Sequence, residues 1–255
     1  MPPKTSIVQP KKGPPVPDGQ LKERMVTHPF DADGGVLAVT FCSNNNTAVS
    51  RFRYVRTNAF TKERKAGQRM YTAMDTTRTM GAGRGNDLIL PLFRHHLQPG
   101  LNKYRKNTSN TRVMVWANKV LTLWEGGLPY KLDMLALSTE GRSQLGGILK
   151  EEQPMGGKAV YDSKRDRMVM YANQPDARSS KLTLYEFNAK FKLTNEVTTE
   201  LPGFALLSDF ALTQNYYIFV QPPVTVNAMK FMFNKEPGNI LELQQGPSVS
   251  GKQVR

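Results

Sequence analysis

Four side chains in the 255 residues are of the types that bind transition metals through nitrogen or sulfur: His28, His95, His96 and Cys42. A single cysteine excludes an internal disulfide and a cysteine-ligated zinc or iron–sulfur site. His95 and His96 are adjacent, and adjacent side chains rarely converge on one ion, so a surface or partner contact explains them better. His28 precedes the Asp31–Gly35 turn and is expected to pack or to form a hydrogen bond. The histidines and the cysteine therefore offer little material for a metal site.

The glycine-rich run Gly81–Gly85 is the other candidate for chemistry, as a phosphate-binding loop. No strong strand precedes it and no Lys-Ser/Thr pair follows, so a plain loop explains it better. The sequence also contains no H-E-x-x-H pair and no serine in a G-x-S-x-G turn. Because these motifs are absent, the sequence does not support a P-loop nucleotide hydrolase, a zinc protease or an α/β-hydrolase.

The net charge of +14 favours an acidic partner, such as nucleic acid, anionic lipid or an acidic protein face. The excess lies almost wholly in the first half of the chain. It begins in a proline-rich segment, residues 1–20, which is expected to be an extended arm whose Lys4, Lys11 and Lys12 contact a partner. The 18 or so consecutive apolar residues of a membrane-spanning helix are absent from the sequence, although peripheral membrane contact is compatible with it.

A second basic group, Arg51, Arg53 and Arg56, alternates with aromatic residues and also offers a partner surface. In a strand, Arg51 and Arg53 lie on one face and Phe52 and Tyr54 on the other. A basic face beside aromatic rings is one way to bind RNA. Because the aromatic residues lie on the opposite face, where a core is expected, protein contact is favoured over nucleic acid.

The residues discussed above lie in or between short apolar runs that are separated by glycine, asparagine and proline. This pattern predicts an all-β fold of antiparallel hairpins. One or two solvated helical turns are expected at Lys62–Gln68, with few helices elsewhere. We expect three parts: the arm at 1–20, a domain of antiparallel hairpins at 21–243, arranged as a sandwich, a barrel or a propeller, and a loose tail at 244–255. The expected strands are Val36–Cys42, Ser50–Thr57, Arg112–Ala117, Lys119–Trp124, Arg167–Ala172, Lys181–Phe187, Phe191–Glu196 and Tyr216–Gln221.

Several ordered motifs resemble the carotenoid cleavage oxygenase family, a group of iron-dependent enzymes built on a seven-bladed β-propeller. They are Phe30–Gly35 with Arg53–Thr57, the Trp124–Gly127 turn, Leu201–Gly203 and Asp209–Tyr216. The resemblance covers about Lys22 to Gly238 and corresponds to the N-terminal half of such an enzyme. It implies that the domain at 21–243 is a partial β-propeller of antiparallel blades.

The resemblance also implies where iron would bind, because the family holds the metal with four histidines. The two histidine positions of this half correspond here to Lys158 and Ser208. An ammonium group repels a divalent cation and a serine hydroxyl is a weak ligand. Glu125 matches a family glutamate that supports an iron ligand, and it is expected to pair with Lys158 or to accept from backbone donors. We therefore expect neither iron nor catalysis, while a bound carotenoid remains compatible.

The favoured hypothesis is thus a non-catalytic accessory subunit of a larger assembly, at a plastid thylakoid membrane and associated with a photosystem. The alternative is a divergent iron-dependent carotenoid or apocarotenoid cleavage dioxygenase, truncated or completed by another chain. A basic RNA- or ribosome-associated protein is the third hypothesis. Lipid or pigment contact is expected at a run of apolar residues: Leu88, Ile89, Leu90, Leu92 and Phe93.

Overall fold

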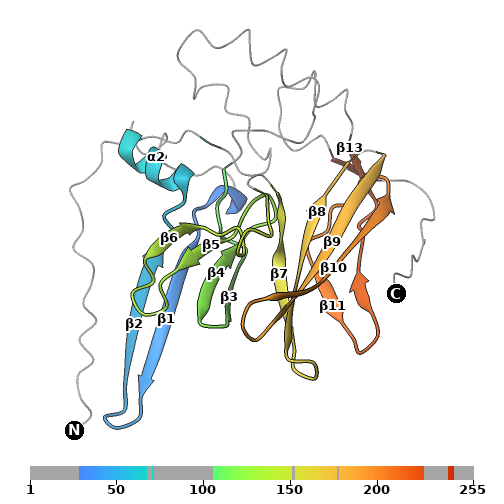
Figure 1. Ribbon diagram of the computed structural model, residues 1–255. Coiled ribbons are helices and arrows are strands. Elements are labelled where there is room, and N and C mark those ends of the chain that lie inside the picture. Colours follow the sequence, from blue (N-terminus) through green and yellow to red (C-terminus); the bar gives the residue numbers. More distant parts are fainter. Residues whose placement is uncertain are drawn as a thin grey trace.

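The computed structural model describes residues 29–67, 71, 106–150, 153–176, 178–226 and 241–243. Its strands form a row of separate antiparallel sheets, arranged side by side like the blades of a fan (Figure 1). Two of these sheets have four strands and three have two. The expected all-β fold, a partial propeller with few helices, is confirmed. The arm at 1–20, the tail at 244–255, the three histidines and the apolar run at 88–93 lie outside the described residues.

The first four-stranded blade comprises β3 (Arg112–Trp116), β4 (Lys119–Leu123), β5 (Tyr130–Leu132) and β6 (Thr139–Arg142). Its first hairpin has the expected turn, in which Ala117 and Asn118 join the paired residues Trp116 and Lys119. Both turn residues have positive φ, 47° and 58°, as a two-residue type I′ turn requires. The apolar side chains of β4 are buried, which fixes this strand in the middle of the blade.

The second blade comprises β7 (Met155–Asp162), β8 (Arg167–Gln174), β9 (Ser179–Asn188) and β10 (Leu193–Pro202), in the order β10-β9-β8-β7. The sequence did not indicate β7, because Gly156 and Gly157 are typical of a turn. The strand β10 runs to Pro202, well beyond the expected end at Glu196. Its residues pair with β9 as far as Ser179, the first residue of that strand.

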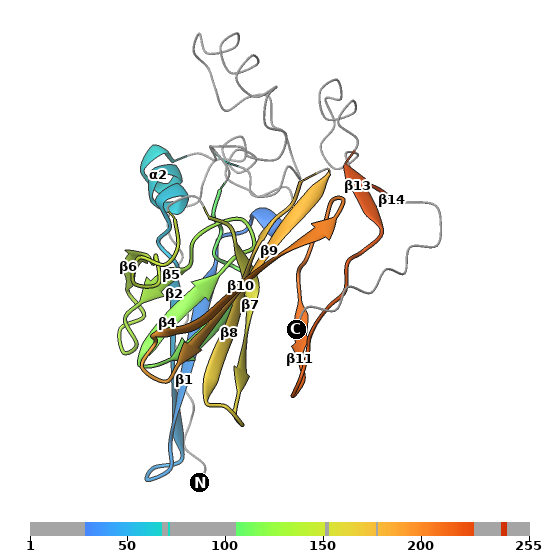
Figure 2. The same cartoon turned by 45° about the vertical axis from the view of Figure 1, so that its right-hand side comes forward.

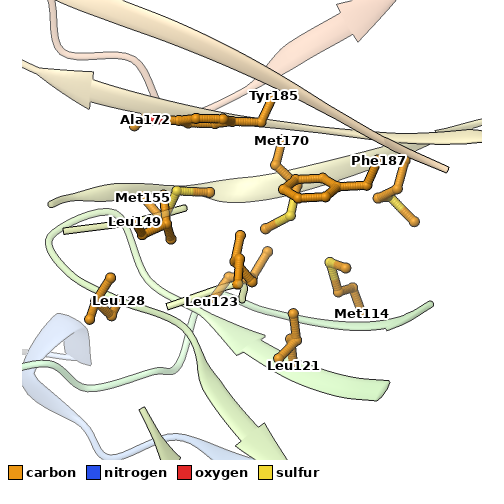
Figure 3. Close-up of a cluster of buried hydrophobic side chains, with 12 residues drawn as sticks. Met114, Leu121, Leu123, Leu128, Leu149, Met155, Met170, Ala172, Tyr185 and Phe187 are labelled. Atoms are coloured by element: carbon orange, nitrogen blue, oxygen red, sulfur yellow. The ribbon is translucent and has the colours of Figure 1, made fainter. Parts of the chain in front are cut away.

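The main core lies between the two blades (Figure 3). Leu121 and Leu123 of β4 face Met170 of β8 and Phe187 of β9, and all four side chains are buried. Each fully buried side chain of this size stabilises the fold by about 1.5–3 kcal/mol. The blades therefore hold each other in a fixed relation, and this relation positions everything between them.

A second core lies on the opposite face of the same blade. In β8, Met168 and Met170 contribute to the first core, whereas Val169 and Tyr171 contribute to the second. The short sheet of β11 (Phe210–Leu212) and β12 (Tyr217–Phe219) packs against this second face. The blade β7–β10 is thus covered on both sides, which explains the nearly continuous apolar run of β8.

Besides the helix α2 (Asn58–Ala66), three smaller elements complete the described residues. They are a hairpin of β1 (Gly35–Cys42) and β2 (Thr47–Tyr54), a pair of β13 (Val224–Val226) and β14 (Leu241–Leu243), and the 3-10 turn η1 (Pro29–Asp31). Figure 1 places the β1–β2 hairpin and the strand β11 on opposite sides of the two large blades, and Figure 2 shows β13 and β14 on the same side as β11. Within the described part of the chain, no helix has the length and apolar character to span a bilayer.

The helix α2 (Asn58–Ala66) begins earlier than the expected turns at Lys62–Gln68. Thr57 is its N-cap, and the Thr57 hydroxyl oxygen accepts a hydrogen bond from the Phe60 amide at 3.1 Å. At the other end, Gly67 adopts the left-handed conformation (φ 69°) that ends many helices. The expectation that Thr57 ends a strand is wrong, because the threonine caps a helix instead.

Candidate functional site

The Trp124–Gly127 turn joins β4 to β5 within the first blade, and it also contacts the first strand of the second blade. The indole of Trp124 is buried against Gly126, where an added Cβ would lie 2.1 Å from the ring. One residue on, the carbonyl oxygen of Gly127 accepts a hydrogen bond from the Met155 amide of β7 at 3.2 Å. The turn therefore has a fixed shape, and its second residue, Glu125, is held at the start of β7.

The Glu125 carboxylate lies against the β7 backbone. Its Oε2 accepts a hydrogen bond from the Thr111 hydroxyl at 2.8 Å. A Cβ on Gly157 would lie 2.4 Å from Glu125 Oε1, so the carboxylate occupies the space that any other residue would fill. Glycine at position 157 therefore makes room for the Glu125 carboxylate, which the neighbouring sequence does not reveal.

Lys158, the next residue, forms an ion pair with Asp209, and its Nζ lies 5.9 Å from the centre of the Phe210 ring. The hydrogen bond from the Lys158 ammonium is the largest influence on the Asp209 carboxyl and lowers its pKa. Lys158, expected as the partner of Glu125, therefore pairs with the residue that follows Ser208. In this way the fold brings the segments around positions 158 and 208 together from β7 and the start of β11.

Tyr171 of β8 lies beneath this group and is fully buried. Its hydroxyl donates a hydrogen bond to the Leu207 carbonyl at 3.1 Å, and its ring fills the space above Gly156. Burial is the main cause that raises the pKa of the Tyr171 phenol, and the charges of Glu125 and Asp209 raise it further. The phenol is therefore neutral at physiological pH. We call the group Glu125, Lys158, Tyr171, Ser208 and Asp209 the hub cluster.

The hub cluster does not by itself fit an iron ion. Among the described residues, no group of three or more histidine, cysteine, aspartate or glutamate side chains could hold a metal. The Lys158 ammonium repels a divalent cation, and Ser208 is an exposed neutral hydroxyl. The cluster comprises a carboxylate from the turn after β4, an ion pair between β7 and the segment before β11, and a buried neutral phenol from β8.

The chain matches the family described as retinal pigment epithelial membrane protein over residues 11–247. It belongs to this family. An apocarotenoid-15,15'-oxygenase of Synechocystis is 33% identical over 220 residues, which are 84% of this chain and 42% of that protein. An isoeugenol monooxygenase of Pseudomonas nitroreducens is 26% identical over 94% of this chain and 47% of its own length. The chain therefore spans less than half the length of these relatives.

Solved structures of family members have the same fold. A glutamate-to-glutamine variant of the Synechocystis apocarotenoid oxygenase superposes with a TM-score of 0.72 and 30% identity, over 87% of this chain and 45% of that one. The cobalt-substituted form of the same enzyme gives a TM-score of 0.72 at 31% identity. The partial family propeller expected from the sequence is thus confirmed.

Two expectations from the sequence are corrected by these findings. The expectation of a protein without catalysis is wrong, because the matched relatives are named as oxygenases. The expectation of a protein without a metal cofactor is also wrong, since a metal belongs to the family, as the cobalt-substituted relative shows. Both expectations rested on Lys158 and Ser208 and on the absence of the family's second half from this chain.

The basic group has a structural placement that the sequence only partly predicted. The register of β1 and β2 puts Arg51 and Arg53 on one face and Phe52 and Tyr54 on the other, as expected. Arg51 donates to the Leu135 carbonyl, and the Arg56 amide donates to the Thr139 hydroxyl at 2.8 Å. The basic face thus contacts the first blade. The aromatic face, which was expected to be core, is instead exposed in this chain.

Sequence reasoning missed three members or neighbours of the hub cluster: Thr111, Tyr171 and Asp209. Thr111 and Tyr171 have no neighbouring motif that singles them out. Asp209 stands in the Asp209–Tyr216 motif, and its position directly after Ser208 was a usable signal. The contacts depend on the packing of β4, β7 and β11, which no local pattern specifies.

Proposed function

We propose that the protein is the N-terminal half of an oxygenase that cleaves a carbon–carbon double bond of a carotenoid or apocarotenoid. The observation that carries the proposal is the match to the Synechocystis apocarotenoid oxygenase over 84% of this chain. The Trp124–Gly127 turn supports it, because the turn holds the Glu125 carboxylate at the junction of the two blades.

The names of the relatives support a substrate class. Apocarotenoids, resveratrol and isoeugenol, which appear in these names, all contain an alkene conjugated with further π bonds. Cleavage of such a bond by O₂ converts each alkene carbon into a carbonyl carbon, and each carbonyl receives one oxygen atom. The reaction is balanced with O₂ alone and needs no external reductant. A long polyene is favoured here because the highest of these identities is to the apocarotenoid oxygenase.

The family metal supplies oxygen activation when it is bound. We propose that Lys158 and Ser208 stand at two positions where family oxygenases carry iron-binding histidines, and that Glu125 stands where the family has its supporting glutamate. Because Lys158 and Ser208 do not fit iron, the proposed activity requires ligands from the rest of the complete protein. In the described residues, the role of this half is to hold Glu125 and to keep the Tyr171 phenol neutral beside it.

The test fuses this chain to the C-terminal remainder of the Synechocystis relative. Bound iron is measured by elemental analysis, and cleavage by the loss of polyene absorbance of an apocarotenal under oxygen. We expect iron-dependent cleavage, and we expect Glu125→Gln to lower kcat by about 10–100-fold, the usual cost of losing a group that orients a metal ligand. Glu140→Gln is the matched control, because that carboxylate pairs with Lys131 on the exposed rim of the first blade.

A folded fusion that binds iron and leaves the apocarotenal intact would overturn the proposal. The double variant Lys158→His with Ser208→His tests the position assignment separately. We expect it to raise the iron content at equal protein concentration, and an unchanged iron content would refute the assignment of these two positions.

We further propose that the complete protein acts in a plastid, at the thylakoid membrane. Support comes from the carotenoid cleavage dioxygenase 7 of Oryza sativa, which is named as chloroplastic and is 25% identical over 85% of this chain. Association with a photosystem stays a prediction from the sequence. The complete protein fused to a fluorescent reporter in leaf cells should follow chlorophyll fluorescence, whereas a cytosolic signal would contradict this location.

A further inference from the structure

The ion pair of Lys158 with Asp209 is open to solvent. The Lys158 side chain is 21% exposed and that of Asp209 62%. An exposed ion pair of this kind contributes little to stability, because water already solvates both charges. On one side the pair has a defined surrounding, since the Lys158 Nζ lies 5.9 Å from the centre of the buried Phe210 ring. A primary amine is therefore held at the hub, within reach of dissolved molecules.

The segment that carries Asp209 does not need this ion pair to stay in place. Side chains of β8 and β9 donate hydrogen bonds to three backbone carbonyls of the segment, at 2.8–3.1 Å: Tyr171 to Leu207, Asn173 to Ala205 and Ser180 to Gly203. The Ala205 and Leu207 side chains are buried in the second core. The position of the segment therefore gives no reason for an amine at position 158.

The strand β7 fixes the other side of the pair. A Cβ on Gly157 would lie 2.4 Å from Glu125 Oε1, so the residue before Lys158 is packed against the Trp124–Gly127 turn. The amine and the carboxylate thus belong to two segments whose backbones are held independently of the ion pair. A site that is already ordered loses little further freedom when a ligand binds, and this favours binding.

We propose that Lys158 binds a conjugated aldehyde covalently, as an iminium whose counter-ion is Asp209. The class of aldehyde rests on the proposed function, because cleavage of one double bond of a polyene by O₂ gives aldehydes that are still conjugated. In the proposed assignment, Lys158 also stands at the position of a family iron ligand. Such an aldehyde would therefore form close to the Lys158 amine.

The condensation is balanced without a further reactant. The Lys158 ammonium releases a proton, and the nitrogen lone pair forms a bond to the aldehyde carbon. The carbonyl oxygen leaves as water, and the nitrogen is protonated again in the iminium. One positive charge faces Asp209 before and after the reaction, so capture of the aldehyde leaves no charge unpaired. The hydrogen bond from Lys158 lowers the pKa of the Asp209 carboxyl, which keeps this counter-ion ionised at neutral pH.

The test incubates the full 255-residue chain, without added metal, with all-trans-retinal as the conjugated aldehyde. The protonated iminium of such an aldehyde absorbs at longer wavelength than the free aldehyde. Reduction with borohydride converts it into a stable secondary amine, which peptide mass spectrometry locates. The main variant is Lys158→Arg, because arginine keeps the charge beside Asp209 but has no primary amine. Lys131→Arg is the matched control, because Lys131 pairs with Glu140 and is 39% exposed. Circular dichroism checks the folding of each variant.

We expect the long-wavelength band and the adduct at Lys158 in the wild-type chain and in Lys131→Arg, and neither in Lys158→Arg. Asp209→Asn should lower the yield of adduct about tenfold, since the iminium loses a charged hydrogen-bond partner. Equal amounts of adduct at Lys131 and Lys158 would overturn the inference, and so would a Lys158→Arg variant that keeps the band.

The outcomes separate this inference from the proposed function. The incubation uses neither iron nor the C-terminal half of a relative, so a missing adduct refutes the inference and leaves the proposed cleavage activity standing. A fusion that binds iron without cleaving the apocarotenal refutes the proposed function, while an adduct at Lys158 of the chain alone would still show the amine site.

Discussion

Lys106 offers the sharpest test of what holds the N-terminal part of the fold in place. Its side chain is 2% exposed, and its Nζ lies 2.9 Å from Asp33 Oδ1 and 2.9 Å from Glu63 Oε2. The lysine thereby joins the segment before β1, helix α2 and the segment before β3. Lys106→Met keeps most of the side-chain volume but removes the charge, so Asp33 and Glu63 both lose the ammonium group that they share.

The expected loss follows from burial. Removing one partner of a buried ion pair costs about 3–5 kcal/mol, because the remaining charge stays desolvated. Asp33 is 23% exposed and Glu63 11%, so water reaches part of each carboxylate and the lower end applies. We expect Lys106→Met to lower the free energy of unfolding by about 3 kcal/mol at pH 7, measured by urea denaturation. Lys131→Met is the control, because its pair with Glu140 is exposed on both sides and contributes about 0–1 kcal/mol.

The loss of unfolding free energy caused by Lys106→Met should become smaller as the pH falls. Burial already raises the pKa of the Asp33 carboxyl above its usual range, although Lys106 opposes the shift. Without Lys106 this pKa rises further, so the folded state favours the protonated acid. The deficit is therefore full at pH 7 and shrinks as the pH falls toward about 4, the unfolded value. Equal losses for Lys106→Met and Lys131→Met, or a deficit that grows on acidification, would refute the reasoning.

Three further changes test the hub cluster and its supports. Gly157→Ala should displace the Glu125 side chain, because the new Cβ would lie 2.4 Å from the carboxylate oxygen; we expect a loss of about 1–3 kcal/mol in urea denaturation, and wild-type stability would contradict this packing. Tyr171→Phe leaves a buried carbonyl without its donor and should cost about 1–2 kcal/mol by the same measurement, whereas a neutral effect would show that water replaces the hydroxyl. Burial raises the pKa of Glu186, but hydrogen bonds, including one from Arg167, outweigh it, so the folded pKa is lowered. This contribution is present above about pH 4.5 and lost as the pH falls through the folded value, so Glu186→Gln should flatten the decline in stability below pH 5, and an unchanged acid slope would exclude the pair as its cause.

The same charged group shows how distant strands are joined. Arg167 of β8 donates to Glu186 of β9, and Tyr217 of β12 donates to the other carboxylate oxygen of Glu186. Burial and this contact with Glu186 raise the pKa of Tyr217 to about 12. The phenol is therefore neutral and remains a donor throughout the physiological range. The short sheet β11–β12 is thus tied to the second blade by hydrogen bonds as well as by its apolar face.

Local patterns predicted the strands in which apolar residues alternate or form a continuous run between turn residues. The β3–β4 hairpin follows from alternation and a two-residue turn, and both of its strands lie where the sequence placed them to within a residue. The strand β7 was missed because Gly156 and Gly157 resemble turn residues. Glycine stands at these two positions because of long-range contacts. The Tyr171 ring occupies the space of a side chain at position 156, and the Glu125 carboxylate occupies that at position 157. A sequence pattern cannot show which distant group fills such a space.

The prediction that the aromatic face of β2 belongs to the core was wrong for a related reason. Alternation correctly separated Phe52 and Tyr54 from Arg51 and Arg53, but it cannot say which body covers each face. Arg51 on the basic face donates to the Leu135 carbonyl of the first blade, whereas Phe52 and Tyr54 on the other face are both 49% exposed. Covered and uncovered apolar faces have the same sequence pattern, so this difference becomes visible only in the three-dimensional structure.

The same reasoning explains why Lys158 and Ser208 pointed to the wrong conclusion about catalysis. A site on the axis of a propeller receives side chains from blades all around the ring, so two full blades contain only part of any such site. The ion pair of Lys158 with Asp209 joins β7 to the start of β11 within this half of the propeller. It does not define the ligands that the other blades contribute. The decisive comparison is therefore between the chain alone and its fusion to the C-terminal remainder of the Synechocystis relative. Iron bound only by the fusion would place the missing ligands in the second half.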